Sequence, residues 1–222
     1  MGEKTKPLAG RRVLVTAGPT VEDLDPVRFL SNRSTGRMGV ALARAALQRG
    51  AEVILVHGPL QVPVPRAPRL QAVPVRSARQ MHRAVMRLIR GTDAAILCAA
   101  VADFTPARTS PQKIKKGNRK HLVLELERTP DILAAVGGLK KRPYLVGFAA
   151  ETGGLVRNAL AKLHQKNCDL ICANKVGVKN TGFGSKTNRV TLFPRDGHRI
   201  PLPLLSKGKA AARIMDFIAK HL

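Results

Sequence analysis

Short apolar runs alternate with helical patterns along most of this chain, and that alternation constrains the fold more than any other feature. Strands are expected at Arg12–Thr16, Glu52–Val56, Leu70–Val75, Asp93–Ala100, Leu122–Leu126, Tyr144–Phe148 and Asp169–Ala173, and helices at Met38–Arg49, Ser77–Arg90, Leu155–Lys166 and Lys207–His221. A further helix is expected to open at Pro130, with Thr129 as its cap. This order predicts an α/β, Rossmann-like fold with a doubly wound, mainly parallel sheet. Asn188–Phe193 and Arg199–Leu202 flank a turn and predict a C-terminal hairpin extension.

The chain has 222 residues, enough for one domain with a full core. Residues 1–10 are expected to be a linker or tail, and residues 11–222 the folded domain. No apolar run approaches the roughly 20 residues of a membrane span, and the first residues lack the apolar segment of a signal peptide. We therefore expect a cytoplasmic protein with no membrane partner.

The cysteines support the same compartment. Cys98, Cys168 and Cys172 are odd in number and lie within apolar, strand-like runs. This pattern predicts buried thiols in a reducing environment instead of a disulfide framework. A zinc site is not expected, because Cys168 and Cys172 have no second Cys or His pair at finger spacing.

The formal net charge of +25 favours anionic partners. Arg79, Arg83 and Arg87 recur every four residues and define one face of the expected helix 77–90, opposite an apolar face that holds Met81 and Val85. The pattern is typical of a solvated basic face over a core face. A nucleic-acid-binding module is the sharper alternative. The low aromatic content of 3% leaves few groups that could stack on single-stranded bases.

The stretch Leu24–Gly39 joins the first strand to the first long helix. A loop in this position is where α/β proteins hold phosphates, because free backbone N–H groups and the helix dipole both favour an anion there. Ser34-Thr35-Gly36 suits a phosphate loop, with two hydroxyl groups and a glycine that permits close approach. The residues alone leave a second interpretation open, in which Ser34 simply caps the helix.

A nicotinamide oxidoreductase is the usual function for this order of elements, but two features argue against it. The first loop reads Ala17-Gly18-Pro19-Thr20, without the G-x-G-x-x-G cradle. The second strand ends at His57-Gly58, with no acid for the ribose hydroxyls of NAD. An NADP-dependent variant is the remaining form of this alternative.

Seven motifs together resemble phosphopantothenoylcysteine synthetase, the ligase half of the bacterial bifunctional coenzyme A biosynthesis flavoprotein. They are VTAGPT at Val15–Thr20, LDPVRFLSN at Leu24–Asn32, CAAVADF at Cys98–Phe104, KIKK at Lys113–Lys116, PDIL at Pro130–Leu133, GFAAET at Gly147–Thr152 and DLICAN at Asp169–Asn174. They occur in the family's order and cover the chain from about Arg11 to its C-terminus.

The resemblance implies a ligase that joins 4′-phosphopantothenate to L-cysteine. CTP, with Mg²⁺, would activate the carboxylate as an acyl-cytidylate and release pyrophosphate, and cysteine would then displace CMP. A cytoplasmic homodimer is implied, and nucleic acid is not an expected partner. No flavin is expected in this chain, because the decarboxylase half is absent. The chain is either an excised domain or one of two separate enzymes, so a separate phosphopantothenoylcysteine decarboxylase is an expected partner.

The resemblance also implies site residues. The catalytic ones are Asn32, whose amide would donate to the acyl carbonyl, and Lys113 on a mobile loop. Nucleotide-binding residues would be Leu97, Cys98, Ala99, Asp103, Lys113, Pro130, Asp131, Ile132, Leu133, Phe148, Lys162 and Lys166, and substrate-binding residues Arg28, Asn32 and Ala100. No metal ligands are assigned.

Each of these residues has a plain structural alternative. Lys113 could lie in a solvated basic loop, Arg28 could pair with Asp23 or Asp25, Asp103 could form an Asx turn, and Phe148 could be core. Lys162 and Lys166 lie four apart on one helix, within about 6 Å of each other. They form either a phosphate site or an ordinary exposed face.

Overall fold

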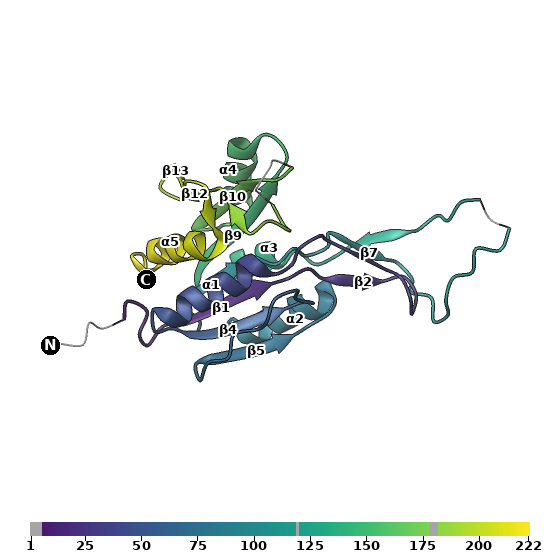
Figure 1. Ribbon diagram of the computed structural model, residues 1–222, viewed down its shortest axis with the longest axis horizontal. Coiled ribbons are helices and arrows are strands. Elements are labelled where there is room, and N and C mark those ends of the chain that lie inside the picture. The colour runs from purple at the N-terminus through teal and green to yellow at the C-terminus, as the bar shows by residue number, and fades with distance from the viewer. Residues whose placement is uncertain (1–5, 119, 178–181) are drawn as a thin grey trace.

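The computed structural model describes residues 6–118, 120–177 and 182–222, and its centre is an eight-stranded sheet (Figure 1). The strand order is β13-β12-β10-β9-β6-β1-β4-β5. The strands are β1 (Arg12–Ala17), β4 (Glu52–His57), β5 (Leu70–Pro74), β6 (Ala94–Leu97), β9 (Tyr144–Glu151), β10 (Leu170–Lys175), β12 (Val190–Pro194) and β13 (Ile200–Pro201). From β10 to β5 all neighbours are parallel, whereas β12 and β13 form an antiparallel hairpin at one edge. The Rossmann-like α/β fold with its hairpin extension is therefore confirmed.

Helices cover both faces of the sheet. α1 (Arg37–Gln48) and α5 (Lys207–Ala219) pack on one face, and α2 (Ala78–Leu88), α3 (Ile132–Gly137) and α4 (Leu155–Gln165) pack on the other. The strands are apolar on both sides because each face is covered. In β1, for example, Val13 and Val15 enter the α1/α5 core and Leu14 enters the opposite core.

The first described residues belong to the packed domain. Leu8 is fully buried in the α1/α5 core, and its backbone N–H donates to Arg49 O across 2.9 Å. The packed part of the chain therefore includes residues that the sequence assigns to a tail.

The helix α2 follows its sequence pattern closely. Ser77 caps it, and a capping box joins Ser77 and Gln80. Met81 and Val85 are fully buried. Arg79, Arg83 and Arg87 are exposed. The expected solvated basic face is confirmed.

Two expected elements are wrong. Residues 122–125 form no strand, and only Leu126–Arg128 pairs, as β8, with β7 (Phe104–Pro106) outside the main sheet. The alternating apolar residues of this segment do not pack against another layer of the protein, and Val123 is 89% exposed. Thr129 does not cap α3, because its Oγ1 donates to Ala102 O. Asp131 caps α3 instead, accepting from Ala134 N across 2.8 Å.

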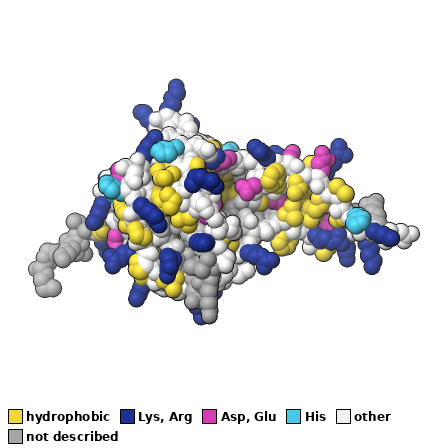
Figure 2. Space-filling view, turned by 90° about the horizontal axis from the view of Figure 1, so that it is seen from above, with side chains coloured by type: hydrophobic (Ala, Val, Ile, Leu, Met, Phe, Trp, Pro, Cys, Tyr) yellow, Lys and Arg dark blue, Asp and Glu magenta, His cyan; other side chains and the backbone are white. Residues whose placement is uncertain are grey.

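Two short ladders lie outside the main sheet in addition to β7–β8. β2 (Val21–Asp23) pairs with β3 (Phe29–Ser31), and β11 (Thr187–Asn188) pairs with β14 (Leu205–Ser206). The β2–β3 and β7–β8 ladders, with the described part of the loop between β7 and β8, project from the domain as an arm, defined here as residues 21–31, 104–118 and 120–128 (Figure 1). Large apolar side chains are exposed along it: Val27, Phe29, Phe104, Leu122, Val123, Leu124 and Leu126. The space-filling view shows them as yellow patches among basic side chains (Figure 2).

Candidate functional site

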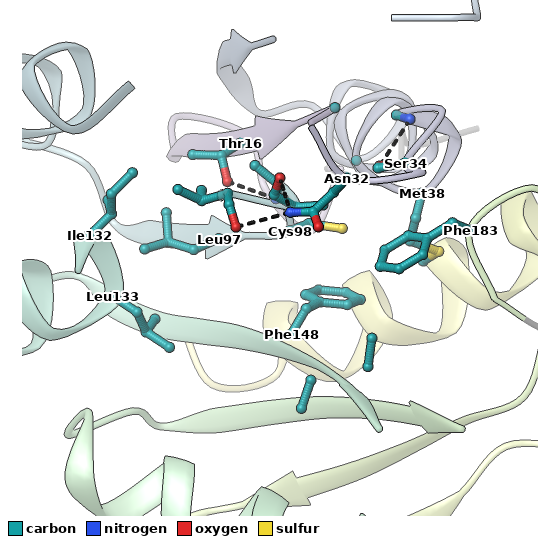
Figure 3. Close-up of a pocket in the computed structure, with 18 of the residues that line it drawn as sticks. Thr16, Asn32, Ser34, Met38, Leu97, Cys98, Ile132, Leu133, Phe148 and Phe183 are labelled. Atoms are coloured by element: carbon teal, nitrogen blue, oxygen red, sulfur yellow. Dashed lines mark hydrogen bonds between the residues drawn. The ribbon is translucent and has the colours of Figure 1, made fainter. Parts of the chain in front are cut away.

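A cavity of about 750 Å³ lies at the carboxyl ends of β1, β6, β9 and β10 (Figure 3). In open parallel sheets the strand order reverses at such a point, and the crevice beyond the strand ends is where ligands bind. Leu97, Cys98, Phe148 and Asn174 contribute to its walls from three of these strand ends.

Most residues singled out from the sequence line this cavity. They are Asn32, Ser34, Thr35, Gly36, Leu97, Cys98, Ala99, Ala100, Asp103, Pro130, Asp131, Ile132, Leu133, Phe148, Lys162 and Lys166. Arg28 and Lys113 do not line it. The fold therefore gathers segments that are far apart in the sequence, but it leaves the expected substrate-binding Arg28 and the expected catalytic Lys113 outside the cavity.

The cavity crosses the edge of the sheet and has two lobes. One, here called the α4 lobe, lies on the α3/α4 face and includes Leu97, Ile132 and Leu133. The other, the α5 lobe, lies on the α1/α5 face and includes Met38 and Phe183. Figure 3 shows Phe148 between the two groups, opposite Asn32 and Cys98.

The lysines of the α4 lobe both have partners within the protein. Lys162 Nζ donates to Phe148 O across 2.8 Å, and Lys166 Nζ lies 2.7 Å from Asp131 Oδ2. Burial lowers the pKa of Lys162, although nearby acidic groups, Asp103 and Asp131 among them, act to raise it. The pKa of Asp131 is lowered: burial would raise it, but the Lys166 ammonium and the N–H of Ala134 outweigh that effect. Two ammonium groups and two carboxylates share this lobe, and Arg128, which pairs with Phe104 beside Asp103, adds a third cation to the lining.

Asn32 is held by two main-chain carbonyls. Its Nδ2 donates to Ala100 O across 3.0 Å and to Val101 O across 3.1 Å. Thr16 Oγ1 supports the same segment by accepting from Ala99 N across 3.0 Å. Because both amide hydrogens of Asn32 are used, Oδ1 is the polar atom that its side chain presents to the cavity (Figure 3).

The start of α1 faces the cavity without a side-chain cap. Its N-cap is Gly36, at φ +77°, where an added Cβ would lie 2.1 Å from Leu60 Cδ2. Ser34 does not cap the helix; its Oγ only accepts from Gly36 N across 3.3 Å. The first turn carries no acidic residue. The capping interpretation of Ser34 is therefore wrong, and the helix dipole acts directly on the cavity.

The α5 lobe contains polar groups that sequence reasoning missed. Asn174, Asn188 and Lys207 are 8%, 4% and 7% exposed, and all three line the cavity. Lys207 Nζ donates to Gly182 O across 3.1 Å and to Phe183 O across 2.9 Å. Asn174 ends the DLICAN motif. Its position near a strand end was the one feature of the sequence that could have indicated that it belongs to the site. Lys207 carries no such signal, since a lysine at the start of a helix is usually solvated.

The thiol in this lobe is not set up as a nucleophile. Burial raises the pKa of Cys98 to about 12, although the Lys207 ammonium lowers it in part. All three cysteines are free thiols, with Cys168 and Cys172 buried and Cys98 half-buried, as the sequence predicts.

Asp25 ties Arg28 to the loop that contains Lys113, through the N–H of the next residue, Ile114. The buried Asp25 carboxylate accepts from the N–H groups of Val27, Arg28 and Ile114, and lies 3.5 Å from Arg28 Nη1. Burial would raise the pKa of Asp25, but these N–H groups outweigh it and the pKa is lowered. The alternative pairing of Arg28 with Asp25 is thus observed, and Lys113 is exposed on the adjoining loop.

Comparison with known proteins identifies the family of this chain. The family model described as "DNA/pantothenate metabolism flavoprotein C-terminal domain" matches residues 8–222. The chain belongs to this family. A curated family relative, the coenzyme A biosynthesis bifunctional protein CoaBC of Bacillus subtilis, is 48% identical over 217 residues, covering 98% of the chain and 53% of the relative. The chain therefore spans about half the length of the curated relatives it matches.

Solved structures agree. The crystal structure of the C-terminal domain of a CoaBC protein has a TM-score of 0.83 at 41% identity, covering 97% of each chain. A Cab2 variant in complex with phosphopantothenate-cysteine has a TM-score of 0.75 at 20% identity, covering 95% of this chain and 86% of the Cab2 chain, and shows a shared fold. Among the described residues, every helix is too short or too polar to span a bilayer.

Proposed function

We propose that the protein is a CTP-dependent ligase that joins 4′-phosphopantothenate to L-cysteine in the cytoplasm, as a step of coenzyme A biosynthesis. The observation that carries the proposal is the two-lobed cavity, which Asn32 lines together with Lys162 and the uncapped start of α1. The family and the CoaBC relatives support it. A Cab2 variant of the same fold was solved in complex with phosphopantothenate-cysteine, the product type of such a reaction.

In the first step, a carboxylate oxygen of phosphopantothenate forms a bond to the α-phosphorus of CTP. The bond from that phosphorus to the bridging oxygen breaks, and pyrophosphate leaves with the electron pair. Negative charge grows on the phosphoryl oxygens and on the leaving group, so the site must supply positive charge there. Lys162 and the start of α1 line the cavity and supply it.

In the second step, the cysteine amine attacks the acyl carbon, the acyl–phosphate bond breaks, and CMP leaves. Asn32 Oδ1 is placed to accept a hydrogen bond from the attacking amine, because Nδ2 is already committed to Ala100 O and Val101 O. The donor role implied by the resemblance would require Asn32 Nδ2 to leave those carbonyls.

Magnesium would enter with the triphosphate. Among the described residues no group of three His, Cys, Asp or Glu side chains could hold a metal by itself. This composition fits Mg²⁺, which binds through one or two carboxylates together with substrate phosphates. Asp103 lines the cavity and makes no side-chain hydrogen bond to another described residue, whereas Asp131 is engaged by Lys166. Mg²⁺ held near Asp103 would neutralise charge on the phosphates.

A second copy of the chain would complete the site. Exposed apolar side chains cover the arm, and contiguous apolar surface on a soluble protein marks an interaction site. Arg28, paired with Asp25, and Lys113, next to the Ile114 whose N–H binds Asp25, both lie on that arm and outside their own cavity. In a two-fold dimer the arm of one subunit can place both cations at the cavity of the other. The mobile-loop role of Lys113 would then operate across the interface.

The direct test is an assay with 4′-phosphopantothenate, CTP, Mg²⁺ and cysteine. We expect CMP and pyrophosphate in equal amounts, with CMP release dependent on phosphopantothenate. CMP release that ignores phosphopantothenate, or its complete absence, would rule the ligase out. Light scattering after size exclusion should give a dimer, and a fully active monomer would exclude the shared site.

A further inference from the structure

The main-chain carbonyls that hold Asn32 lie outside the regular part of the sheet. Its Nδ2 donates to Ala100 O and Val101 O, in the segment that follows β6 (Figure 3). Ala100 forms one isolated parallel bridge, with Pro19, and Val101 belongs to no helix or strand. No ladder of sheet hydrogen bonds fixes such a segment, so other groups must hold the carbonyls that Asn32 uses.

Thr20 holds this segment from the side of the first loop. The residue is fully buried, and its N–H, carbonyl and hydroxyl groups are all hydrogen-bonded. The N–H donates to Ala100 O across 3.3 Å, Oγ1 accepts from Ala102 N across 2.9 Å, and the carbonyl accepts from Ser31 Oγ across 2.8 Å. Thr20 is therefore bonded both to the segment on which Asn32 rests and to the residue that precedes Asn32.

Ala102 is bound at both of its main-chain polar groups. Thr129 Oγ1 donates to Ala102 O across 2.6 Å, while the Thr20 hydroxyl takes the N–H. Because Ala102 is 9% exposed, an N–H without an acceptor there would be unfavourable. If the Thr20 hydroxyl were removed, the segment would shift to find that N–H a new partner. Such a shift would displace the two carbonyls that Asn32 uses.

The orientation of the Asn32 amide depends on those carbonyls. Oδ1 faces the cavity because both hydrogens of Nδ2 are taken by main-chain oxygens. The two ends of an amide have nearly the same shape, so hydrogen-bond partners alone decide which end points outward. Without them the amide can turn and present N–H groups, which cannot accept a hydrogen bond from the cysteine amine in the proposed second step.

We infer that Thr20 is a positioning residue for Asn32, whose hydroxyl fixes the orientation of the amide for the attack of cysteine on the acyl intermediate. This inference rests on the proposed function for the identity of that step. Thr20 is not among the residues that line the cavity, so it acts through residues 100–102 and Ser31.

The test compares Thr20→Val, which has nearly the same shape but no hydroxyl, with Thr20→Ser, which keeps the hydroxyl. Rapid quench measures the release of pyrophosphate and of CMP separately. We expect Thr20→Val to slow CMP release by about tenfold or more and pyrophosphate release by less than about twofold, so that acyl-cytidylate accumulates. Thr20→Ser should stay within about twofold of the wild type in both steps.

Thr92→Val is the matched control. Thr92 is 9% exposed, its Oγ1 donates to Ile89 O across 2.8 Å, and it does not line the cavity. The change removes a buried threonine hydroxyl elsewhere in the domain, and we expect both steps to keep the wild-type rates. Equal slowing of the two steps by Thr20→Val would mean that Thr20 serves stability alone, and wild-type rates would mean that its hydroxyl has no role. Either result overturns the inference.

A double-mutant cycle tests whether Thr20 acts through Asn32. In an Asn32→Ala background the amide is absent, so the addition of Thr20→Val should slow CMP release by less than about a further twofold. Losses that multiply would give Thr20 a separate role and would overturn the inference. Should Thr20→Val not fold, Ser31→Ala removes an exposed side chain that is bonded to Thr20 O. It should slow CMP release alone, by about threefold, and wild-type rates would count against the inference.

A measurement on the ligand-free protein separates this inference from the proposed function. The heteronuclear NOE of Asn32 Nδ2 reports how rigidly the side chain is held on the nanosecond timescale. We expect a high value in the wild type and in Thr20→Ser, and its loss in Thr20→Val. If the NOE is lost in Thr20→Val but the wild type releases no CMP, the positioning role stands and the ligase does not. If the wild type releases CMP and Thr20→Val keeps both the NOE and the rate, the ligase stands and the positioning role does not.

Discussion

The ammonium of Lys166 lies 2.7 Å from the carboxylate of Asp131, so the residue that ends α4 is tied to the residue that caps α3. The pair lines the α4 lobe, and within it each charge neutralises the other. A lysine that looks like a phosphate ligand in the sequence is, in the folded chain, already neutralised.

Replacement of Asp131 by Asn should remove this ion pair but keep the cap, since both residues cap helices well. The folded-state pKa of Asp131 is lowered, so its contribution to the free energy of unfolding is present above about pH 4 and is lost as pH falls through the folded pKa. The pair is partly exposed, and we expect a loss of about 0.5 to 1 kcal/mol at pH 7. Urea unfolding at pH 7, 5 and 3 should show the difference between variant and wild type closing at the lowest pH. A difference that does not depend on pH would contradict this account.

Lys162→Met should weaken CMP and CTP binding alike. In the proposed first step Lys162 supplies positive charge to the α-phosphate, which both ligands carry, and its ammonium is held by Phe148 O. We expect about a tenfold loss for each, measured by calorimetry. Arg157→Met, exposed on the same helix, is the control and should bind both normally. A loss of affinity confined to CTP would mean that Lys162 acts only on the β- and γ-phosphates, which CMP lacks.

Asn32→Asp should let the acyl-cytidylate accumulate. Aspartate cannot donate to Ala100 O and Val101 O, and its charge would lie against both carbonyls. We expect the second step to slow by at least about tenfold while pyrophosphate is still released. Rapid quench followed by mass spectrometry measures the intermediate and CMP separately. Normal turnover of this variant would remove Asn32 from the mechanism.

Lys113→Ala should abolish pyrophosphate release, and the defect should be repaired across the dimer. Lys113 is outside its own cavity, so a subunit with this change but an intact cavity can borrow the lysine of its partner. Random mixing with Asn32→Asp subunits should restore about a quarter of the wild-type rate, because half of the dimers then hold one intact site. No recovery in co-expressed, doubly tagged dimers would show that Lys113 acts within its own chain. Lys120→Ala, on the same loop, should retain the rate.

Gly137→Ala should destabilise the α3–α4 contact. An added Cβ would lie 2.0 Å from Lys166 O, so the main chain at Lys166 must move. We expect a loss of about 1 to 3 kcal/mol in the free energy of unfolding, together with weaker nucleotide binding. At Gly138 the nearest atom to an added Cβ is 3.4 Å away, and Gly138→Ala should be nearly neutral. Similar unfolding curves for both variants would refute the contact argument.

The sequence by itself determined which segments form the strands of the main sheet, in their order along the chain. It also determined the buried face of α2 and the polar segments at the strand ends. Periodicity and turn chemistry act over a few residues, so a local pattern is enough for each of these. Only the tertiary structure decided which polar groups are buried, paired or displaced. Leu122–Leu126 has the alternating pattern of a strand, but its apolar side chains do not pack against another layer. Lys207, at the start of α5, is of a residue type that is usually exposed, but it is buried beside the cavity. Arg28 and Lys113 match site motifs, yet both lie on the arm, where the Asp25 carboxylate binds Arg28 and the N–H of Ile114. Burial and ion pairing depend on residues far apart in the chain, and no local pattern encodes them.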